Sequence, residues 1–77
     1  MDGLTELRIP ISGLGCGGGG ATTLERELAS VAGVRRVYVN PATEMAYVSA
    51  ERDAVDILAL LYRIDQAGYR AGRPVRA

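Results

Sequence analysis

The chain has no histidine, tryptophan, phenylalanine or lysine, and its 77 residues include a single cysteine, Cys16. Without histidine the chain lacks the commonest general base, and its carboxylates are scattered, so acid–base or nucleophilic catalysis finds no support and we expect no enzyme. One cysteine cannot form an internal disulfide, which favours a reducing compartment. We therefore expect a cytoplasmic protein.

Charge of one sign and long apolar runs are also missing. Nine arginines balance nine acidic residues, so the net charge is zero, which argues against nucleic acid as a partner. The amino terminus does not resemble a signal peptide, and no run approaches the roughly 20 apolar residues of a membrane span. We expect no direct membrane insertion and one domain over 1–77, with its core at about 4–72.

The segment 11–21, ISGLGCGGGGA, concentrates six of the ten glycines around Cys16. It lies between an alternating apolar run and a helical pattern, so Cys16 is expected in a turn before a helix amino terminus. The unpaired amides there favour an anion, so the thiol pKa should be depressed and the thiolate available to soft metals or electrophiles. A small, buried and inert cysteine and an oxidant-sensing thiol remain alternatives.

The same glycines formally match a dinucleotide-binding fingerprint, Gly13-x-Gly15-x-x-Gly18. The second expected strand ends in Asn40 instead of an acidic residue, and 77 residues are too few for a doubly wound sheet. The match is therefore attributed to chance within a glycine run. An anion at the helix start remains physically possible, and the last glycines of the run are also compatible with the first helical turn.

Apolar periodicity predicts the secondary structure. Leu7, Ile9 and Ile11 alternate with polar residues, as in a half-buried strand, whereas Leu24 and Leu28 recur at helical spacing. The elements expected on this basis are strands over 5–12, 34–40, 44–50 and 69–75, and helices over 21–32 and 53–67.

The helix ends are predicted from capping residues. Thr22 or Thr23 is expected to cap the first helix, and Asp53 the second. Gly33 and Gly68 are expected to end them, because glycine readily adopts the left-handed conformation found after a helix.

The predicted order β-α-β-β-α-β gives an α+β fold, the ferredoxin-like sandwich, with a four-stranded antiparallel sheet and two helices on one face. Right-handed crossovers then give the strand order 4-1-3-2. The outer face of the central hairpin should stack Tyr38 against Tyr47. The topology also makes Tyr69 a neighbour of Cys16, although some fifty residues separate them.

At this point the chain resembles the heavy-metal-associated domain, the fold of small copper chaperones and of the amino-terminal modules of metal-pumping P-type ATPases. Their pattern is a strand, Gly-Met-x-Cys-x-x-Cys, a helix, a "GV" strand, a hairpin, a second helix and "GY.A". The residues that carry the resemblance are Gly13-Leu14-Gly15-Cys16-Gly17-Gly18-Gly19, Gly33-Val34 and Gly68-Tyr69-Arg70-Ala71.

The resemblance implies a metal loop, but this sequence departs from it. Cys16 corresponds to the first thiolate ligand, whereas Gly19 stands where the family has its second cysteine. Leu14 replaces the usual Met as an apolar residue beneath the loop, and Tyr69 matches the aromatic or Lys residue beside it. Some zinc-carrying members have Asp where this chain has Gly15, so nothing supports zinc.

We therefore expect a soft metal ion, foremost Cu(I), to bind the Cys16 thiolate, with a second ligand from a partner or from a metal-bridged homodimer. The expected partner is a metal-transporting P-type ATPase or a copper chaperone. The chain's other soft donors are Met1 and Met45. The alternative function is a metal-free regulatory or docking module that retains the fold.

Overall fold

The computed structural model describes residues 3–13 and 20–76, which form two helices and five strands. The elements in chain order are β1 (Leu4–Ser12), α1 (Gly20–Ala29), β2 (Val34–Asn40), β3 (Met45–Glu51), α2 (Ile57–Gln66), β4 (Arg70–Ala71) and β5 (Val75–Arg76).

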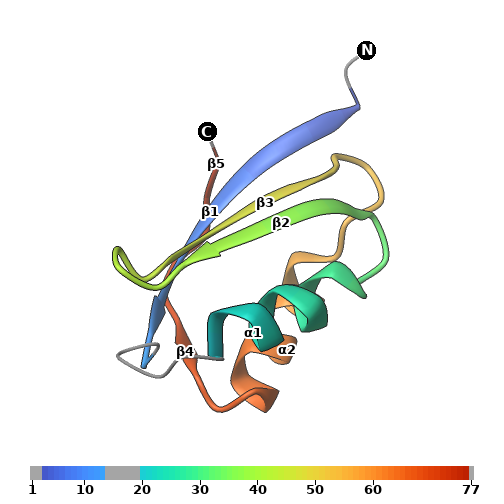
Figure 1. Cartoon of the computed structure of the whole chain (residues 1–77). Helices are drawn as coiled ribbons and strands as arrows, with labels where there is room; N and C mark the ends of the chain where they lie inside the picture. Colours follow the sequence, from blue (N-terminus) through green and yellow to red (C-terminus); the bar gives the residue numbers. More distant parts are fainter. Residues whose placement is uncertain (1–2, 14–19, 77) are drawn as a thin grey trace.

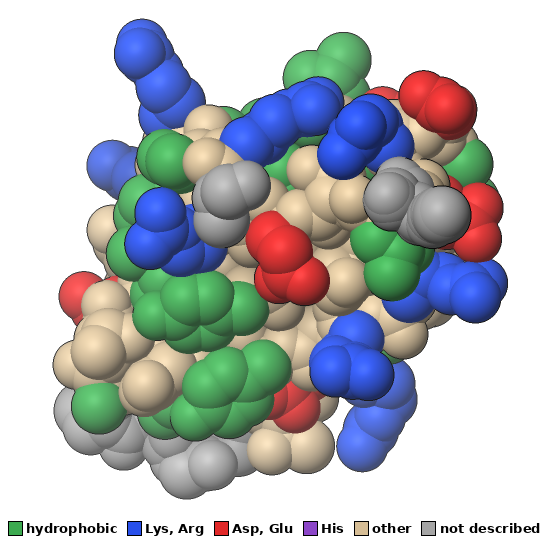
Figure 2. Space-filling view, turned by 90° about the horizontal axis from the view of Figure 1, so that it is seen from above, with side chains coloured by type: hydrophobic (Ala, Val, Ile, Leu, Met, Phe, Trp, Pro, Cys, Tyr) green, Lys and Arg blue, Asp and Glu red, His purple; other side chains and the backbone are tan. Residues whose placement is uncertain are grey.

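The strands form one antiparallel sheet in the order β2-β3-β1-β4, with β5 also pairing β1. Both helices cover the same face of this sheet (Figure 1). The predicted ferredoxin-like fold and its strand order, 4-1-3-2 read from the other edge, are therefore confirmed. Seen from the side away from the helices, the open face carries hydrophobic side chains beside arginines (Figure 2).

The core lies between the sheet and the helices. Alternate side chains of the strands point to the helices and form the sheet's side of this core. Every second residue of β1 and of β3 is buried, while the residues between them are exposed or half-buried. Burying each large aliphatic side chain stabilises the fold by about 1.5–3 kcal/mol. The core residues are Leu7, Ile9, Ile11, Leu24, Leu28, Val31, Val39, Ala46, Val48, Ala50, Leu60 and Ile64.

The β2–β3 hairpin matches its prediction except at one end. The rings of Tyr38 and Tyr47 stack with centroids 6.0 Å apart and an interplanar angle of 17°, which confirms the expected cross-strand pair. Glu44 was expected to begin the second hairpin strand but has φ 54°, the left-handed conformation of the turn. The strand therefore begins at Met45.

The predicted caps of the first helix are wrong, although the last glycine of the run lies in its first turn, as the sequence also allowed. The helix begins at Gly20, so Thr22 and Thr23 lie inside it instead of capping it. It stops at Ala29, because the following amides turn back in short-range bonds, and Gly33 (φ 89°) instead closes this turn before β2.

The second helix begins later than predicted. Residues 52–54 form a turn in which the amides of Ala54 and Val55 donate to the carbonyl of Glu51, so Asp53 caps nothing. The cap is Asp56, whose carboxylate accepts the Ala59 amide at 3.2 Å. Leu58 is 76% exposed, because residues 57, 60, 61 and 64 form the face that turns to the sheet.

The last strand is split into β4 and β5. Ile11 pairs with Ala71 but Leu7 pairs with Arg76, so the last segment holds one more residue than β1 between these pairs. Such an extra residue is a bulge, and Pro74, which has no amide hydrogen to donate, lies within it. Arg76 pairs with β1, so the pairing extends one residue beyond the predicted strand 69–75.

No helix within the described ranges is both long and apolar enough to cross a membrane.

Candidate functional site

The segment that carries the predicted metal loop lies between β1 and α1. Leu14, Gly15, Cys16 and Gly19 lie outside the described residues, so their predicted roles stay predictions. The structure does describe both ends of this segment, Gly13 after β1 and Gly20 at the start of α1, and the site is built from these ends.

A single side chain, Tyr69, packs against both ends of the segment. A Cβ on Gly13 would lie 3.4 Å from Cδ1 of the Tyr69 ring, and a Cβ on Gly20 would overlap the Tyr69 hydroxyl. Gly13 also has φ 101°, which favours glycine. The structure therefore brings together Gly13, Gly20 and Tyr69, from β1, α1 and the junction after α2.

The carboxy-terminal turn of α2 fixes the position of Tyr69. Gly68 adopts φ 93° and its amide donates to the carbonyl of Asp65 at 3.0 Å, while the Tyr69 amide donates to that of Ile64 at 3.1 Å. These are the bonds of a glycine-terminated helix, and they turn the chain directly into β4. The half-buried ring then packs against the core.

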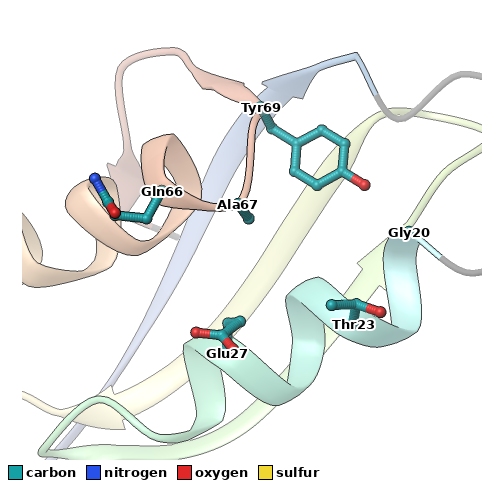
Figure 3. Close-up of a pocket in the computed structure, with 6 residues that line it drawn as sticks. All are labelled: Gly20, Thr23, Glu27, Gln66, Ala67 and Tyr69. Atoms are coloured by element: carbon teal, nitrogen blue, oxygen red, sulfur yellow. The ribbon is translucent and has the colours of Figure 1, made fainter.

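A groove of about 380 Å³ lies beside Tyr69, between the two helices. The Tyr69 ring reaches from the α2–β4 junction toward Gly20, and the side chains of α1 lie across from it (Figure 3). The carboxylate of Glu27 is paired with the guanidinium of Arg63 at 3.0 Å. The lining residues are Gly20, Thr23, Glu27, Gln66, Ala67 and Tyr69.

Tyr69 also lines a second hollow of about 510 Å³, on the side of β1 and β4. Its other lining residues are Ser12, Gly13, Asp65, Gly68 and Arg70. Neither hollow contains a metal-ligand set of its own. Within 3–13 and 20–76, no three histidine, cysteine, aspartate or glutamate side chains lie close enough together to hold an ion.

Met45, Arg35 and Arg36 lie on the sheet. Met45 is half-buried at the start of β3 and pairs with Pro10 of β1, on the face away from the helices. Arg35 forms an ion pair with Glu51 at 3.0 Å, and Arg36 is exposed. These arginines therefore have the character of solvated surface.

The sequence pointed to Gly13 and Tyr69 as site residues, but it did not predict that Gly20 lies against the Tyr69 ring. The available signal was a glycine at the first position of a helical pattern, because glycine there permits the close approach of a bulky neighbour. Thr23 and Gln66, which line the groove, carry no motif or periodicity that distinguishes them from other exposed helix residues.

No protein-family model and no curated protein sequence matches the chain. Solved structures do match it over nearly its whole length. The N-terminal domain of PacS from Synechocystis PCC6803 is 30% identical, with a TM-score of 0.74, and the match covers 91% of this chain and 96% of that one.

Two further structures are similar at lower identity. The N-terminal domain of a potential copper-translocating P-type ATPase from Bacillus subtilis, in its Cu(I)-loaded state, is 25% identical, with a TM-score of 0.79; the match covers 88% of this chain and 84% of that one. The CopZ metallochaperone is 21% identical, with a TM-score of 0.81, and the match covers 87% and 98%.

Proposed function

The chain belongs to the heavy-metal-associated domain family, and on this premise we propose that it binds a soft metal ion, Cu(I), through the thiolate of Cys16 and passes it on. A similar solved structure is that of a Cu(I)-loaded ATPase domain, and another is that of a metallochaperone. Thiolate sulfur is a soft ligand and selects Cu(I) over hard cations.

The observation that carries the proposal is the contact of Tyr69 with Gly13 and Gly20. These glycines flank the six residues that contain Cys16, and one aromatic ring packs against both of them. The two ends of the segment therefore share a common base of β1, α1 and the α2–β4 junction. A ligand-bearing loop on such a base keeps its ends in place when an ion enters or leaves.

Cu(I) is commonly held between two thiolates, and this chain offers one. Its only other sulfur atoms are in Met1 and Met45, and it contains no histidine. We propose that the second ligand comes from the partner to which the ion is passed, or from Cys16 of a second copy. Affinity of the isolated monomer is then weak, which suits transfer better than storage.

The partner in this proposal is a metal-transporting P-type ATPase or a copper chaperone, and the chain acts as a cytoplasmic binding module, not an enzyme. Gly13, Leu14, Gly15 and Gly19 shape the loop, and Tyr69 packs beside it. The domain itself spans 1–77.

One observation favours a second function, a metal-free docking module. Gly19 stands at the second ligand position, and the described part of the chain holds no acidic or thiol cluster to compensate for it. In that case the fold would serve as a regulatory surface, and Cys16 would contribute nothing to metal affinity.

Competition for Cu(I) separates the two functions. Wild type and Cys16→Ala are titrated against a Cu(I) chelator, once at low protein concentration and once at a concentration that favours dimers. The metal-binding proposal expects wild type to take copper from the chelator at the higher concentration and the variant to take none. Equal and feeble competition by both proteins at both concentrations would support the docking module.

A further inference from the structure

The outer edge of β2 is the feature that the proposed function leaves unused. Among the strands that the structure describes, β2 is an end strand that pairs with β3 alone, and α1 lies beneath it (Figure 1). An end strand has a row of backbone amides and carbonyls that no neighbouring strand satisfies, and such a row is a template for another strand. In this structure Val39 is only 2% exposed, and Glu25 of α1 lies against its amide.

Alternate residues of β2 direct their backbone groups toward this edge. The amide of Val39 points away from β3, because it donates to Oε2 of Glu25 on α1 at 2.8 Å. In an antiparallel ladder this direction repeats every second residue, so Val37 presents its amide and carbonyl to the same edge. The Glu25 side chain of α1 thus accepts a charge-assisted hydrogen bond from one of the edge amides and occupies that donor.

We propose that the edge of β2 is a pairing surface for a second copy of this chain, and that Glu25 holds this surface closed. Antiparallel pairing centred on Tyr38 would place Val37 opposite Val39 of the second copy, with their backbone groups exchanging hydrogen bonds. Val39 joins this ladder only when its amide leaves the Glu25 carboxylate, so the two states exclude each other.

The side chains of β2 favour a second copy in this register. Tyr38 is 54% exposed and stacked on Tyr47, so Tyr38 opposite its own counterpart would extend the stack across both sheets. The same register places Arg36 opposite Asn40. A shift by two residues toward the start of β2 would instead place Arg36 opposite Arg36, which like-charge repulsion disfavours.

This contact is independent of the proposed metal site. Antiparallel pairing of two β2 strands directs the two Gly13–Gly20 ends in opposite directions, so it does not bring the Cys16 segments together. If the protein does not bind copper, the β2-edge proposal is unaffected. If the β2 edges do not pair, the metal-binding proposal is unaffected. Every measurement below is made without metal and repeated in a Cys16→Ala background.

The test is the self-association of Glu25 variants, measured by sedimentation equilibrium. Glu25→Ala removes the acceptor and is expected to strengthen dimerisation at least tenfold over wild type. Glu25→Gln keeps an amide oxygen as acceptor and is expected to remain close to wild type. Glu27→Ala is the matched control, because it removes a carboxylate of the same helix that pairs with Arg63 instead of with β2.

A second substitution tests whether the edge itself is used. Val37→Pro removes an amide that is directed to the outer edge of β2, so it costs no bond to β3, and proline is tolerated at such edge positions. In the Glu25→Ala background it should restore the monomer, and amide exchange at Val39 should slow with rising concentration only in Glu25→Ala itself. A Glu25→Ala protein as monomeric as wild type, or equal dimerisation of Glu27→Ala, would overturn the proposal.

Discussion

The hydroxyl of Tyr69 occupies the space into which a Cβ at position 20 would project, and Cζ of the ring lies 3.4 Å from that Cβ position. The first residue of α1 and the junction after α2 are therefore in direct contact, although they are far apart in the sequence. The contact exists only because residue 20 has no side chain.

Gly20→Ala is the substitution that tests this contact. In a helix, replacing glycine by alanine normally stabilises by about 0.5–1 kcal/mol, because alanine loses less backbone entropy. Here the added methyl group must displace the Tyr69 ring, and we expect overpacking to destabilise by about 1–3 kcal/mol instead. Urea denaturation measures the difference.

The control for this prediction is Tyr69→Phe, which removes the hydroxyl and leaves Cζ at ordinary contact distance. In the Tyr69→Phe background, Gly20→Ala should cost little or become stabilising. If Gly20→Ala stabilises the protein with Tyr69 intact, the ring does not pack against α1 as described.

Two glycines with similar backbone angles should respond differently to alanine. Gly33 (φ 89°) and Gly68 (φ 93°) both adopt the left-handed region, where alanine costs about 1–2 kcal/mol. A Cβ on Gly33 would also lie 2.9 Å from backbone atoms of Ala54 and Val55, whereas nothing lies within 4 Å of one on Gly68.

We therefore expect Gly33→Ala to lower the free energy of unfolding by about 1–3 kcal/mol more than Gly68→Ala does. Thermal or urea unfolding of the two variants under one set of conditions gives this comparison. Equal losses would mean that the turn at residues 52–54 does not pack on Gly33.

The ion pair between the helices should contribute little. Glu27 and Arg63 are 47% and 38% exposed, and Arg63 also donates to the Ser30 hydroxyl at 2.8 Å. A double-mutant cycle with alanine at both positions is expected to give a coupling energy of about 0.2–1 kcal/mol, because solvent screens exposed pairs. The coupling should shrink further in high salt, and a value insensitive to salt would contradict this account.

The strands were predictable because the alternation of apolar and polar residues along a strand determines which side chains it buries. Leu7, Ile9 and Ile11 face the core as the pattern indicated, and the stack of Tyr38 on Tyr47 follows from hairpin register. The handedness of crossovers then limits how such strands can be ordered.

The ends of the helices and strands were less predictable, because neighbouring residues compete to cap or pair the backbone groups there. Asp53 and Asp56 are both acceptable caps by sequence, and the turn that follows β3 selects the second. The bulge near Pro74 depends on pairing with β1, which no local pattern reveals. The bond from Val39 to Glu25 likewise joins a strand to a helix, and neither segment alone predicts it.

Gly19→Cys should restore the two-thiolate site of the family. With both sulfurs in one loop, the monomer should bind one Cu(I) tightly, and affinity should no longer depend on protein concentration. Stoichiometry and competition with a chelator measure this change. Gly18→Cys is the matched control, because it adds a thiol at a spacing that the family does not use. Weak binding by Gly19→Cys would mean that the alignment of the loop is wrong.

The central claim is that the Cys16 sulfur binds a soft cation once a second donor is present. Chelator competition by wild type and by Cys16→Ala, each with and without a small added thiol, tests it most directly. The account predicts that the added thiol raises the Cu(I) affinity of wild type and leaves the variant unable to compete. Identical titration curves for the two proteins under every condition would contradict it.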